Sequence, residues 1–245
     1  MSRDLRVLPV EGMPEVAGGA KIGELLAERV ELEDGDVVVV SQKIVSKAEG
    51  RVRRLSEVTA SERARQLGTE LAKEAALVEL VLAESRTVLR AERGVMITET
   101  HHGFVCANAG IDSSNLPEDG TVCLLPEDPD ASARRIRTEL TTPVAVVIAD
   151  SFGRPWRLGQ SEVAIGCAGL APLDDWRGRR DAGGRELTAT AIAIADEVAA
   201  AADLVRAKDE GVPAVVVRGL GRYVSAEDGP GAAALRRPPG QDLFR

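Results

Sequence analysis

The chain has 245 residues, the size of one large domain or of two closely packed lobes. Hydrophobic residues make up 44% of it, enough for a packed core, while aromatic residues make up only 2%. The 31 Lys and Arg against 39 Asp and Glu give a formal net charge of −8. This acidic balance argues against binding to nucleic acids or anionic membranes, since either partner requires a basic face.

In chain order, the sequence alternates helix-forming segments with apolar, β-branched runs typical of buried strands. The predicted elements are a helix over Ile22–Arg29, a strand over Val37–Val40, a helix over Ser61–Ala83, a strand over Gly103–Cys106, a helix over Asp130–Glu139, a strand over Val144–Ile148, a helix over Leu187–Ala207 and a strand over Ala214–Val217. The fold class is therefore mixed α/β, of the α+β kind, although the order of the strands cannot be read. We expect one domain over residues 1–223 and an irregular, Gly- and Pro-rich tail over 224–245.

Cysteine usage and the N-terminus indicate the compartment. Cys106, Cys123 and Cys167 are an odd number of cysteines at wide spacing, which favours free thiols over a disulfide framework or a structural zinc site. The N-terminus lacks the apolar segment of a signal peptide, and no run approaches the ~20 apolar residues that span a bilayer. We expect a cytoplasmic protein that has no membrane partner.

Polar residues follow three of the predicted strands directly, in the segments Ser41–Lys47, Asn108–Asn115 and Asp150–Arg157. Polar groups gathered beyond the carboxyl ends of strands are typical of the ligand crevice of an α/β sheet. The alternative is that these segments are ordinary solvated loops. Three of them in one chain favour the crevice.

Asp112 and Asp150 are the sharpest candidates for a metal site. A carboxylate at the end of an apolar strand needs a partner, and a divalent cation is a natural one. Ser151 and Asn115 add oxygen atoms beside them, and an oxygen-only set suits Mg²⁺ or Mn²⁺ better than zinc. The alternative for either aspartate is a helix N-cap or an Asx-turn.

Basic residues supply candidate contacts for anions. Lys43 and Lys47 lie four residues apart after a strand and could meet phosphate oxygens, although lysines are more often solvated. The segment 174–181 is dense in Arg and Asp; it is either a solvated loop or a basic fork for a carboxylate or phosphate. The sequence has neither a Walker A motif nor Gly-x-Gly-x-x-Gly, which disfavours P-loop and Rossmann nucleotide sites.

Three longer motifs carry a resemblance to a known family. Residues 38–50 read Val-Val-Val-Ser-Gln-Lys-Ile-Val-Ser-Lys-Ala-Glu-Gly, residues 107–115 read Ala-Asn-Ala-Gly-Ile-Asp-Ser-Ser-Asn, and residues 149–160 read Ala-Asp-Ser-Phe-Gly-Arg-Pro-Trp-Arg-Leu-Gly-Gln. Together with later segments up to Gly219, they resemble the coenzyme F420-0:L-glutamate ligase (F420-0:γ-glutamyl ligase) family in order and spacing. The resemblance covers about residues 8–223.

The resemblance implies a GTP-dependent ligase that adds L-glutamate to coenzyme F420-0, a deazaflavin coenzyme precursor, and forms γ-linked glutamyl tails in coenzyme F420 biosynthesis. It also implies two Mg²⁺ or Mn²⁺ ions, K⁺, a homodimer, and a two-lobed fold that is neither P-loop nor Rossmann. The chemistry agrees with the residues. Joining a carboxylate to an amine requires activation, an acyl phosphate serves that purpose, and phosphoryl transfer needs charge neutralisation more than a covalent nucleophile.

The family motifs carry site residues over to this chain. The resemblance gives metal contacts at Asp112, Asp150, Ser151 and Lys208, and nucleotide contacts at Met13, Pro14, Glu15, Val16, Gln42, Lys43, Lys47, Asn115, Arg206, Ala207, Lys208, Asp209, Glu210, Gly211, Val212 and Pro213. Ala207 departs from the family pattern, because many relatives carry glycine there. We expect catalytic roles for Lys47, which would hold a phosphate, and for Arg154 and Arg157, which would hold acidic substrate groups.

Three other functions fit the same residues. A metal-dependent phosphohydrolase could use the two aspartates to place water. A non-catalytic protein could bind a nucleotide without turnover. A ligase of the same class could glutamylate a different acceptor, such as a folate.

Overall fold

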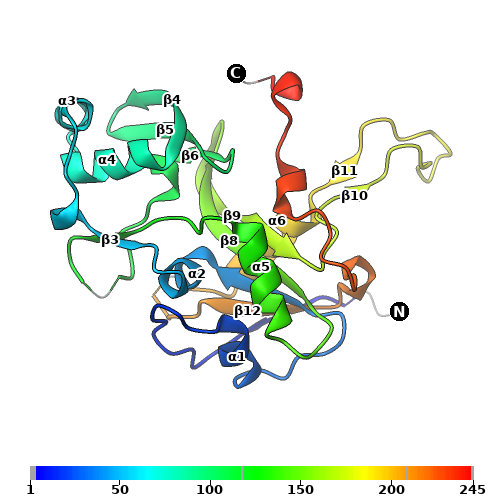
Figure 1. Cartoon of the computed structure of the whole chain (residues 1–245). Coiled ribbons are helices and arrows are strands. Elements are labelled where there is room, and N and C mark those ends of the chain that lie inside the picture. The colour runs from blue at the N-terminus through cyan, green and yellow to red at the C-terminus, as the bar shows by residue number, and fades with distance from the viewer. Residues whose placement is uncertain (1–3, 117, 208, 244–245) are drawn as a thin grey trace.

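The computed structural model describes residues 4–116, 118–207 and 209–243. At its centre lies a five-stranded sheet (Figure 1). The strands, in spatial order, are β1 (Arg6–Pro9), β12 (Ala214–Arg218), β2 (Val37–Ser41), β8 (Ala145–Arg154) and β9 (Arg157–Ala168). β2 and β8 are parallel, and the other neighbouring strands are antiparallel.

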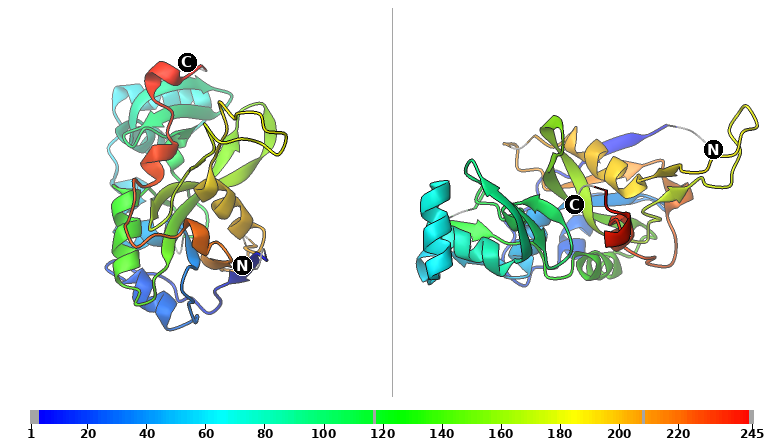
Figure 2. Two further views of the ribbon diagram at one scale, coloured as in Figure 1. Left: turned by 90° about the vertical axis from the view of Figure 1, so that its right-hand side faces the viewer. Right: turned by 90° about the horizontal axis from the view of Figure 1, so that it is seen from above.

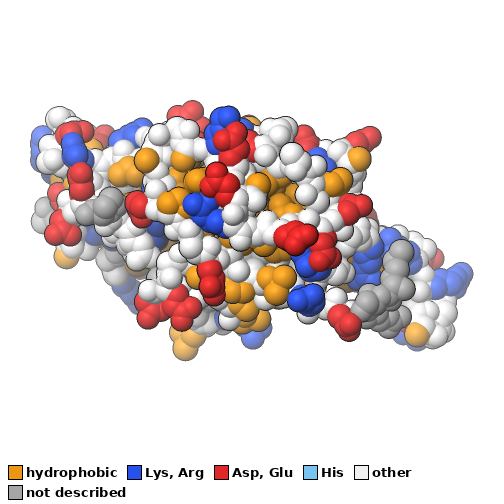
Figure 3. Space-filling view, turned by 90° about the horizontal axis from the view of Figure 1, so that it is seen from below, with side chains coloured by type: hydrophobic (Ala, Val, Ile, Leu, Met, Phe, Trp, Pro, Cys, Tyr) orange, Lys and Arg blue, Asp and Glu red, His pale blue; other side chains and the backbone are white. Residues whose placement is uncertain are grey.

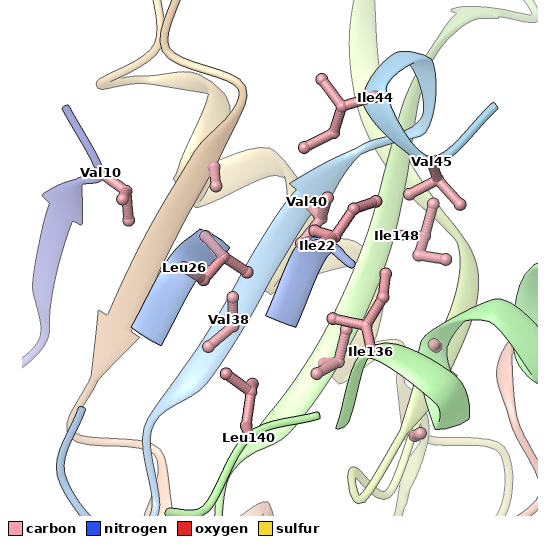
Figure 4. Packing of buried hydrophobic residues seen from close by; sticks show 14 of the residues in the cluster. Val10, Ile22, Leu26, Val38, Val40, Ile44, Val45, Ile136, Leu140 and Ile148 are labelled. Atoms are coloured by element: carbon pink, nitrogen blue, oxygen red, sulfur yellow. The ribbon is translucent and has the colours of Figure 1, made fainter. Parts of the chain in front are cut away.

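Helices cover both faces of this sheet. α1 (Ile22–Ala27), α2 (Gln42–Ala48) and α5 (Pro129–Thr138) pack on one face, and α6 (Ile194–Asp203) packs on the other. Figure 4 shows side chains of the first layer meeting Val38, Val40 and Ile148 of the sheet. Because both faces are covered, the valines of β2 and β12 are all buried, which explains why these strands are continuous rather than alternating apolar runs.

A second lobe is built from the segment between β2 and β8. It contains an antiparallel sheet of β4 (Ser85–Glu92), β5 (Val95–Thr100) and β6 (Val105–Ala107), with α3 (Glu62–Leu71) and α4 (Ala75–Ala83) beside it. Leu71, Val78, Val81 and Met96 form its own small core. The antiparallel pair β3 (Val52–Arg54) and β7 (Thr121–Cys123) joins the lobe to the main sheet. The predicted α+β class is confirmed.

A hairpin arm projects from the opposite end of the molecule (Figure 2). It carries β10 (Asp174–Asp175) and β11 (Ala191–Ile192), and the basic cluster at 177–180 lies on it. Arg177 pairs with Asp175 at 2.5 Å and Arg179 with Asp174 at 3.3 Å. Two arginines of this arm are therefore paired with aspartates, whereas Arg180 donates to the Gly184 carbonyl at 2.6 Å.

Two helices and one strand differ by more than two residues from their predicted bounds. The segment predicted as one helix over Ser61–Ala83 is broken between α3 and α4, where Ala72 adopts a left-handed conformation with φ of 52°. The helix predicted over Leu187–Ala207 begins only at Ile194, because the preceding residues are bonded into the arm. The Leu187 N–H donates to the Arg179 carbonyl, and the Thr190 carbonyl accepts from the Trp176 N–H. Residues 150–154, expected to follow a strand, continue β8 through its pairing with β9.

The segment after β12 packs back onto the main sheet. Asp130, in the first turn of α5, accepts hydrogen bonds from the backbone N–H groups of Ala232, Ala233 and Cys167. Ala232 is buried as a result. The described part of the predicted tail is otherwise irregular, with short 3-10 turns at Ala232–Leu235 and Pro239–Gln241.

The distribution of charged residues and cysteines in the structure bears on the expectations drawn from composition. Seen from below, acidic and basic side chains are interspersed over the molecule (Figure 3). Cys106, Cys123 and Cys167 are buried, and burial raises the pKa of Cys106 and of Cys167 to about 12. Among residues 4–116, 118–207 and 209–243, no helix is long and apolar enough to span a bilayer.

Candidate functional site

A cavity of about 550 Å³ lies where β2 ends and its parallel pairing with β8 stops. The carboxyl ends of parallel strands are where α/β sheets bind ligands. Five segments of the chain form the wall: residues 13–16, the junction of β2 and α2, residues 112–116, the β8–β9 pair, and the loop after α6. The lining residues are Met13, Pro14, Glu15, Val16, Ser41, Gln42, Lys43, Ile44, Lys47, Asp112, Ser114, Asn115, Leu116, Ala149, Asp150, Ser151, Glu162, Asp203, Arg206, Ala207, Asp209, Gly211, Val212 and Pro213.

Two lysines of α2 face this cavity one helical turn apart. The Lys43 ammonium lies 2.9 Å from an Asp112 carboxylate oxygen and donates to the Ser114 hydroxyl at 2.7 Å. The Lys47 ammonium lies 2.5 Å from Glu15 and donates to the Asn115 carbonyl at 3.1 Å. Both lysines therefore have carboxylate partners that an incoming anion can replace.

Asp112 is held in its charged form. It lies on the strand-like segment beside β7, where its backbone exchanges hydrogen bonds with Cys123. Burial acts to raise the pKa of Asp112, but hydrogen bonds from Lys43 and from the backbone N–H of Ser114 outweigh it and lower the pKa. The Ser114 backbone N–H donates a 2.7 Å hydrogen bond to the Asp112 carboxylate, which is the contact that forms an Asx-turn. The same carboxylate therefore stabilises a turn and lines the cavity.

The pKa of Asp150 is shifted in the opposite direction, upward. Burial, the Glu162 carboxylate and the Asp112 carboxylate together raise the pKa of Asp150 to about 7, although a backbone hydrogen bond and Lys43 act against this. Three carboxylates thus influence one another across the cavity wall. A positive charge placed between them would favour the ionised form of Asp150.

Glu162 on β9 was not among the predicted site residues. It lies directly opposite Ser151 in the β8–β9 register and accepts a hydrogen bond from the Ser151 hydroxyl. Its other carboxylate oxygen forms a 2.8 Å ion pair with Arg206. A charged residue directly before the apolar run Val163–Ala168 is a visible signal in the sequence, but its partner on the neighbouring strand is not.

The donor set fits a divalent cation of the Mg²⁺ type. Asp112, Asp150 and Ser151 offer carboxylate and hydroxyl oxygens, the ligands that Mg²⁺ and Mn²⁺ prefer. Within the described ranges, no group of three or more His, Cys, Asp and Glu is arranged to enclose a metal ion. Magnesium commonly takes only one or two carboxylates from the protein and completes its shell with water and phosphate.

Most predicted contacts lie on this cavity. Gln42 lines it while its amide donates to Ser46 and to the Leu124 carbonyl, so this side chain also supports the wall. Glu210 is exposed and is not part of the lining, and Lys208 lies outside the described residues. Arg154 and Arg157 stand at the exposed turn of the β8–β9 hairpin, and Arg154 donates to the Leu158 carbonyl at 2.6 Å. The structure does not bring these two arginines to the cavity.

Comparisons with known proteins give the family of the chain. The family model described as F420-0:Gamma-glutamyl ligase matches residues 12–219. The chain is 44% identical over 251 residues to the coenzyme F420:L-glutamate ligase of Methanothermobacter thermautotrophicus, covering 98% of this chain and 99% of that protein. Its counterpart of the same name in Methanopyrus kandleri is 44% identical over 247 residues, with 98% of each chain covered. In Archaeoglobus fulgidus it is 46% identical over 221 residues, with 88% of each covered. On the family match and these near full-length relatives, the chain belongs to the F420-0:γ-glutamyl ligase family.

Proposed function

We propose that this chain joins L-glutamate to coenzyme F420-0 at the cavity beside the carboxyl end of β2, using GTP as phosphoryl donor. The observation that carries the proposal is the gathering of two lysines and two aspartates around one cavity beside the carboxyl end of β2. A nucleotide polyphosphate with its divalent cation needs this pairing of cationic and carboxylate groups. The matched family and the names of the relatives supply the acceptor and the amino acid.

Lys43 and Lys47 would exchange their present carboxylate partners for phosphate oxygens and orient the transferred phosphoryl group. Asp112 and Asp150, with Ser151, would hold Mg²⁺ or Mn²⁺, which supplies charge neutralisation for phosphoryl transfer when bound. The acceptor carboxylate attacks the γ-phosphorus of GTP, the bond to the β-phosphate oxygen breaks, GDP leaves, and an acyl phosphate forms. The amine of glutamate then attacks the acyl carbon, the amide bond forms, and phosphate leaves.

The family resemblance adds a second divalent cation, K⁺ and a homodimer to the proposal. The choice of GTP over ATP rests on the family resemblance alone, because no lining residue that the structure describes can be assigned to reading the base. Direct competition between GTP and ATP tests the choice of nucleotide. Sedimentation of the protein over a range of concentrations tests the dimer. ATP equal to GTP, or a monomer at every concentration, would remove the corresponding part.

The decisive experiment incubates the protein with F420-0, GTP, L-glutamate and Mn²⁺ and measures the product by mass spectrometry. We expect mass increments of one or more glutamyl residues on F420-0, and little free phosphate unless both acceptor and glutamate are present. Phosphate release from GTP alone would point to a phosphohydrolase. Nucleotide binding without any product would point to a binding protein, and glutamylation of a folate in place of F420-0 to a different acceptor.

A further inference from the structure

Glu162 occupies a protected place beside the proposed nucleotide site. Its side chain is 6% exposed, and it shares one face of the β8–β9 pair with Ser151. One carboxylate oxygen accepts from the Ser151 hydroxyl, and the other pairs with Arg206 Nη2. A buried carboxylate with two partners from different segments fixes those segments relative to each other.

Arg206 is buried to nearly the same extent, with 8% of its side chain exposed. Its Nη2 contacts Glu162 at 2.8 Å and Asp203 at 3.8 Å. Its Nη1 is buried and has no hydrogen-bond partner within the part of the chain that the structure describes. Since a buried donor without an acceptor is unfavourable, the guanidinium has one donor group more than these surroundings satisfy.

Arg206, which carries this unmatched donor, lies at the proposed nucleotide site. Arg206 lines the cavity, and so do Ala207, Asp209 and Gly211 after it. The Glu162–Arg206 pair therefore ties the start of this loop to the sheet edge that carries Asp150 and Ser151. A guanidinium that uses one edge for a carboxylate keeps its other N–H groups for a second oxyanion.

We propose that Glu162 is a positioning residue of the nucleotide site: it holds Arg206 so that a small shift of this side chain gives Nη1 to a phosphate oxygen of the bound nucleotide. Glu162 itself touches no substrate. The inference rests on the proposed function insofar as the ligand is a nucleotide. The inference adds Glu162, which the family motifs did not supply, and gives Arg206 a specific role.

The test measures binding of GDP with Mn²⁺ by calorimetry, which requires no turnover, on the wild type and on Glu162→Gln, Arg206→Lys and the double variant. Glu162→Gln keeps an acceptor for the Ser151 hydroxyl but removes the charge that orients Arg206. Arg206→Lys keeps a cation for Glu162 but removes the second donor edge. We expect each to weaken GDP affinity by about 10-fold to 100-fold, the range for a hydrogen bond to a charged group.

Non-additivity is the sharper expectation. Because both residues act through the same guanidinium, the double variant should bind GDP no more weakly than Arg206→Lys alone. Glu197→Gln, on an exposed position of α6, is the matched control for loss of one negative charge and should leave GDP affinity unchanged. Melting temperatures measured in parallel separate a loss of positioning from a general loss of folding, which would weaken the affinity for GDP and the melting temperature together.

Several outcomes would overturn the inference. Unchanged GDP affinity in Glu162→Gln, or additive losses in the double variant, would remove the positioning role while leaving the proposed ligase activity intact. A raised KM for glutamate with unchanged GDP affinity would assign Arg206 to a substrate carboxylate instead. A wild-type protein that does not bind GDP would overturn this inference and the proposed nucleotide together.

Discussion

The two aspartates of the cavity share a chemistry but not an electrostatic state. Asp112 is paired with Lys43, and its pKa is lowered. Asp150 lies deeper, faces Glu162 and Asp112, and has a pKa raised to about 7. Removing the charge of one should therefore affect stability in the opposite sense from removing the charge of the other.

Asp150→Asn keeps the size of the side chain and removes its charge. If Asp150 helps to hold the divalent cation, ligase turnover should fall by about 10²–10⁴-fold, as for other groups that stabilise charge in a transition state. Metal-free thermal stability at pH 8 should rise, because an ionised carboxylate held among other carboxylates is costly. Full metal-dependent turnover in this variant would remove Asp150 from the metal site.

Asp112→Asn is the matched comparison for that experiment. This variant leaves Lys43 without its carboxylate partner, so metal-free stability should fall rather than rise, by about 0.5–1 kcal/mol for a partly exposed pair. Turnover should fall in both variants. Stability changes of the same sign in the two would contradict the electrostatic difference between the aspartates.

The raised pKa of Asp150 also predicts how metal-free stability depends on pH. The folded chain keeps the Asp150 proton up to about pH 7, whereas the unfolded chain releases it near the ordinary pKa of 3.8. Unfolding therefore releases a proton between these values, and the free energy of unfolding falls as pH rises through this window. Denaturant titrations in EDTA at pH 4.5, 6 and 8 should show this decline in the wild type relative to Asp150→Asn. A constant difference between the two proteins would refute it.

The sequence predicted the site residues that can be recognised from their neighbours along the chain. Asp112, Asp150, Lys43 and Lys47 stand in polar segments that follow or end apolar runs, and all line one cavity. Glu162 was not predicted, because its pairing with Ser151 depends on the register of β8 and β9 and its pairing with Arg206 on the packing of α6. Such contacts come from tertiary structure, and the pattern of residues along the chain does not contain them.

The break between α3 and α4 is a second feature that the sequence pattern did not predict. The residues from 61 to 83 have helical propensity throughout, and neither Gly nor Pro stands at 72–74. The chain turns at Ala72, and Lys73 N–H then bonds to the Gly68 carbonyl at 2.9 Å. A Cβ at Gly68 would lie 2.9 Å from the Lys73 carbonyl oxygen. Gly68 permits this close approach, which was the one local signal of a break.

Ala72→Gly should stabilise the protein. A left-handed residue with a Cβ is strained by roughly 1–2 kcal/mol, and glycine removes that strain while adding entropy to the unfolded chain. We expect a net gain of about 0.5–1 kcal/mol in the free energy of unfolding, measured by denaturant titration. Ala76→Gly, inside α4, is the control and should cost about 1 kcal/mol. A loss in Ala72→Gly would show that the turn is not strained.

In the main sheet, β2, β12 and the first half of β8 were predicted best, because their valine-rich runs are buried on both faces. β1 and β9 were not predicted. The hairpin of β8 and β9 was predicted worst, since β8 runs on for six residues past the predicted end at Ile148. The polar residues there are extended because β9 supplies their hydrogen bonds. Arg154 and Arg157 were placed in a loop near the ligand for this reason, and the hairpin carries them to its exposed turn.

For the molecule as a whole, Asp130 joins three distant parts of the chain: α5, β9 and the C-terminal segment. Asp130→Ala removes the acceptor of three backbone N–H groups and should cost about 1–3 kcal/mol. It should also release the segment that follows Gly231, so that trypsin cuts after Arg236 faster than in the wild type. Asp128→Ala, which removes only the N-cap of α5, is the control. Equal cleavage rates in both variants would contradict the role of Asp130.

The order of strands in the main sheet also has a consequence for synthesis on the ribosome. β2 lies between β12 and β8, and β1 pairs only with β12, so the sheet cannot close until residues 214–218 have emerged. These residues are made about 170 positions after β2, which at the usual elongation rate of 5–20 residues per second takes roughly 10–35 s. Throughout that interval the four consecutive valines of β2 have an open edge. Nascent chains of this protein that stop short of Ala214 should therefore depend on chaperones that bind extended apolar segments.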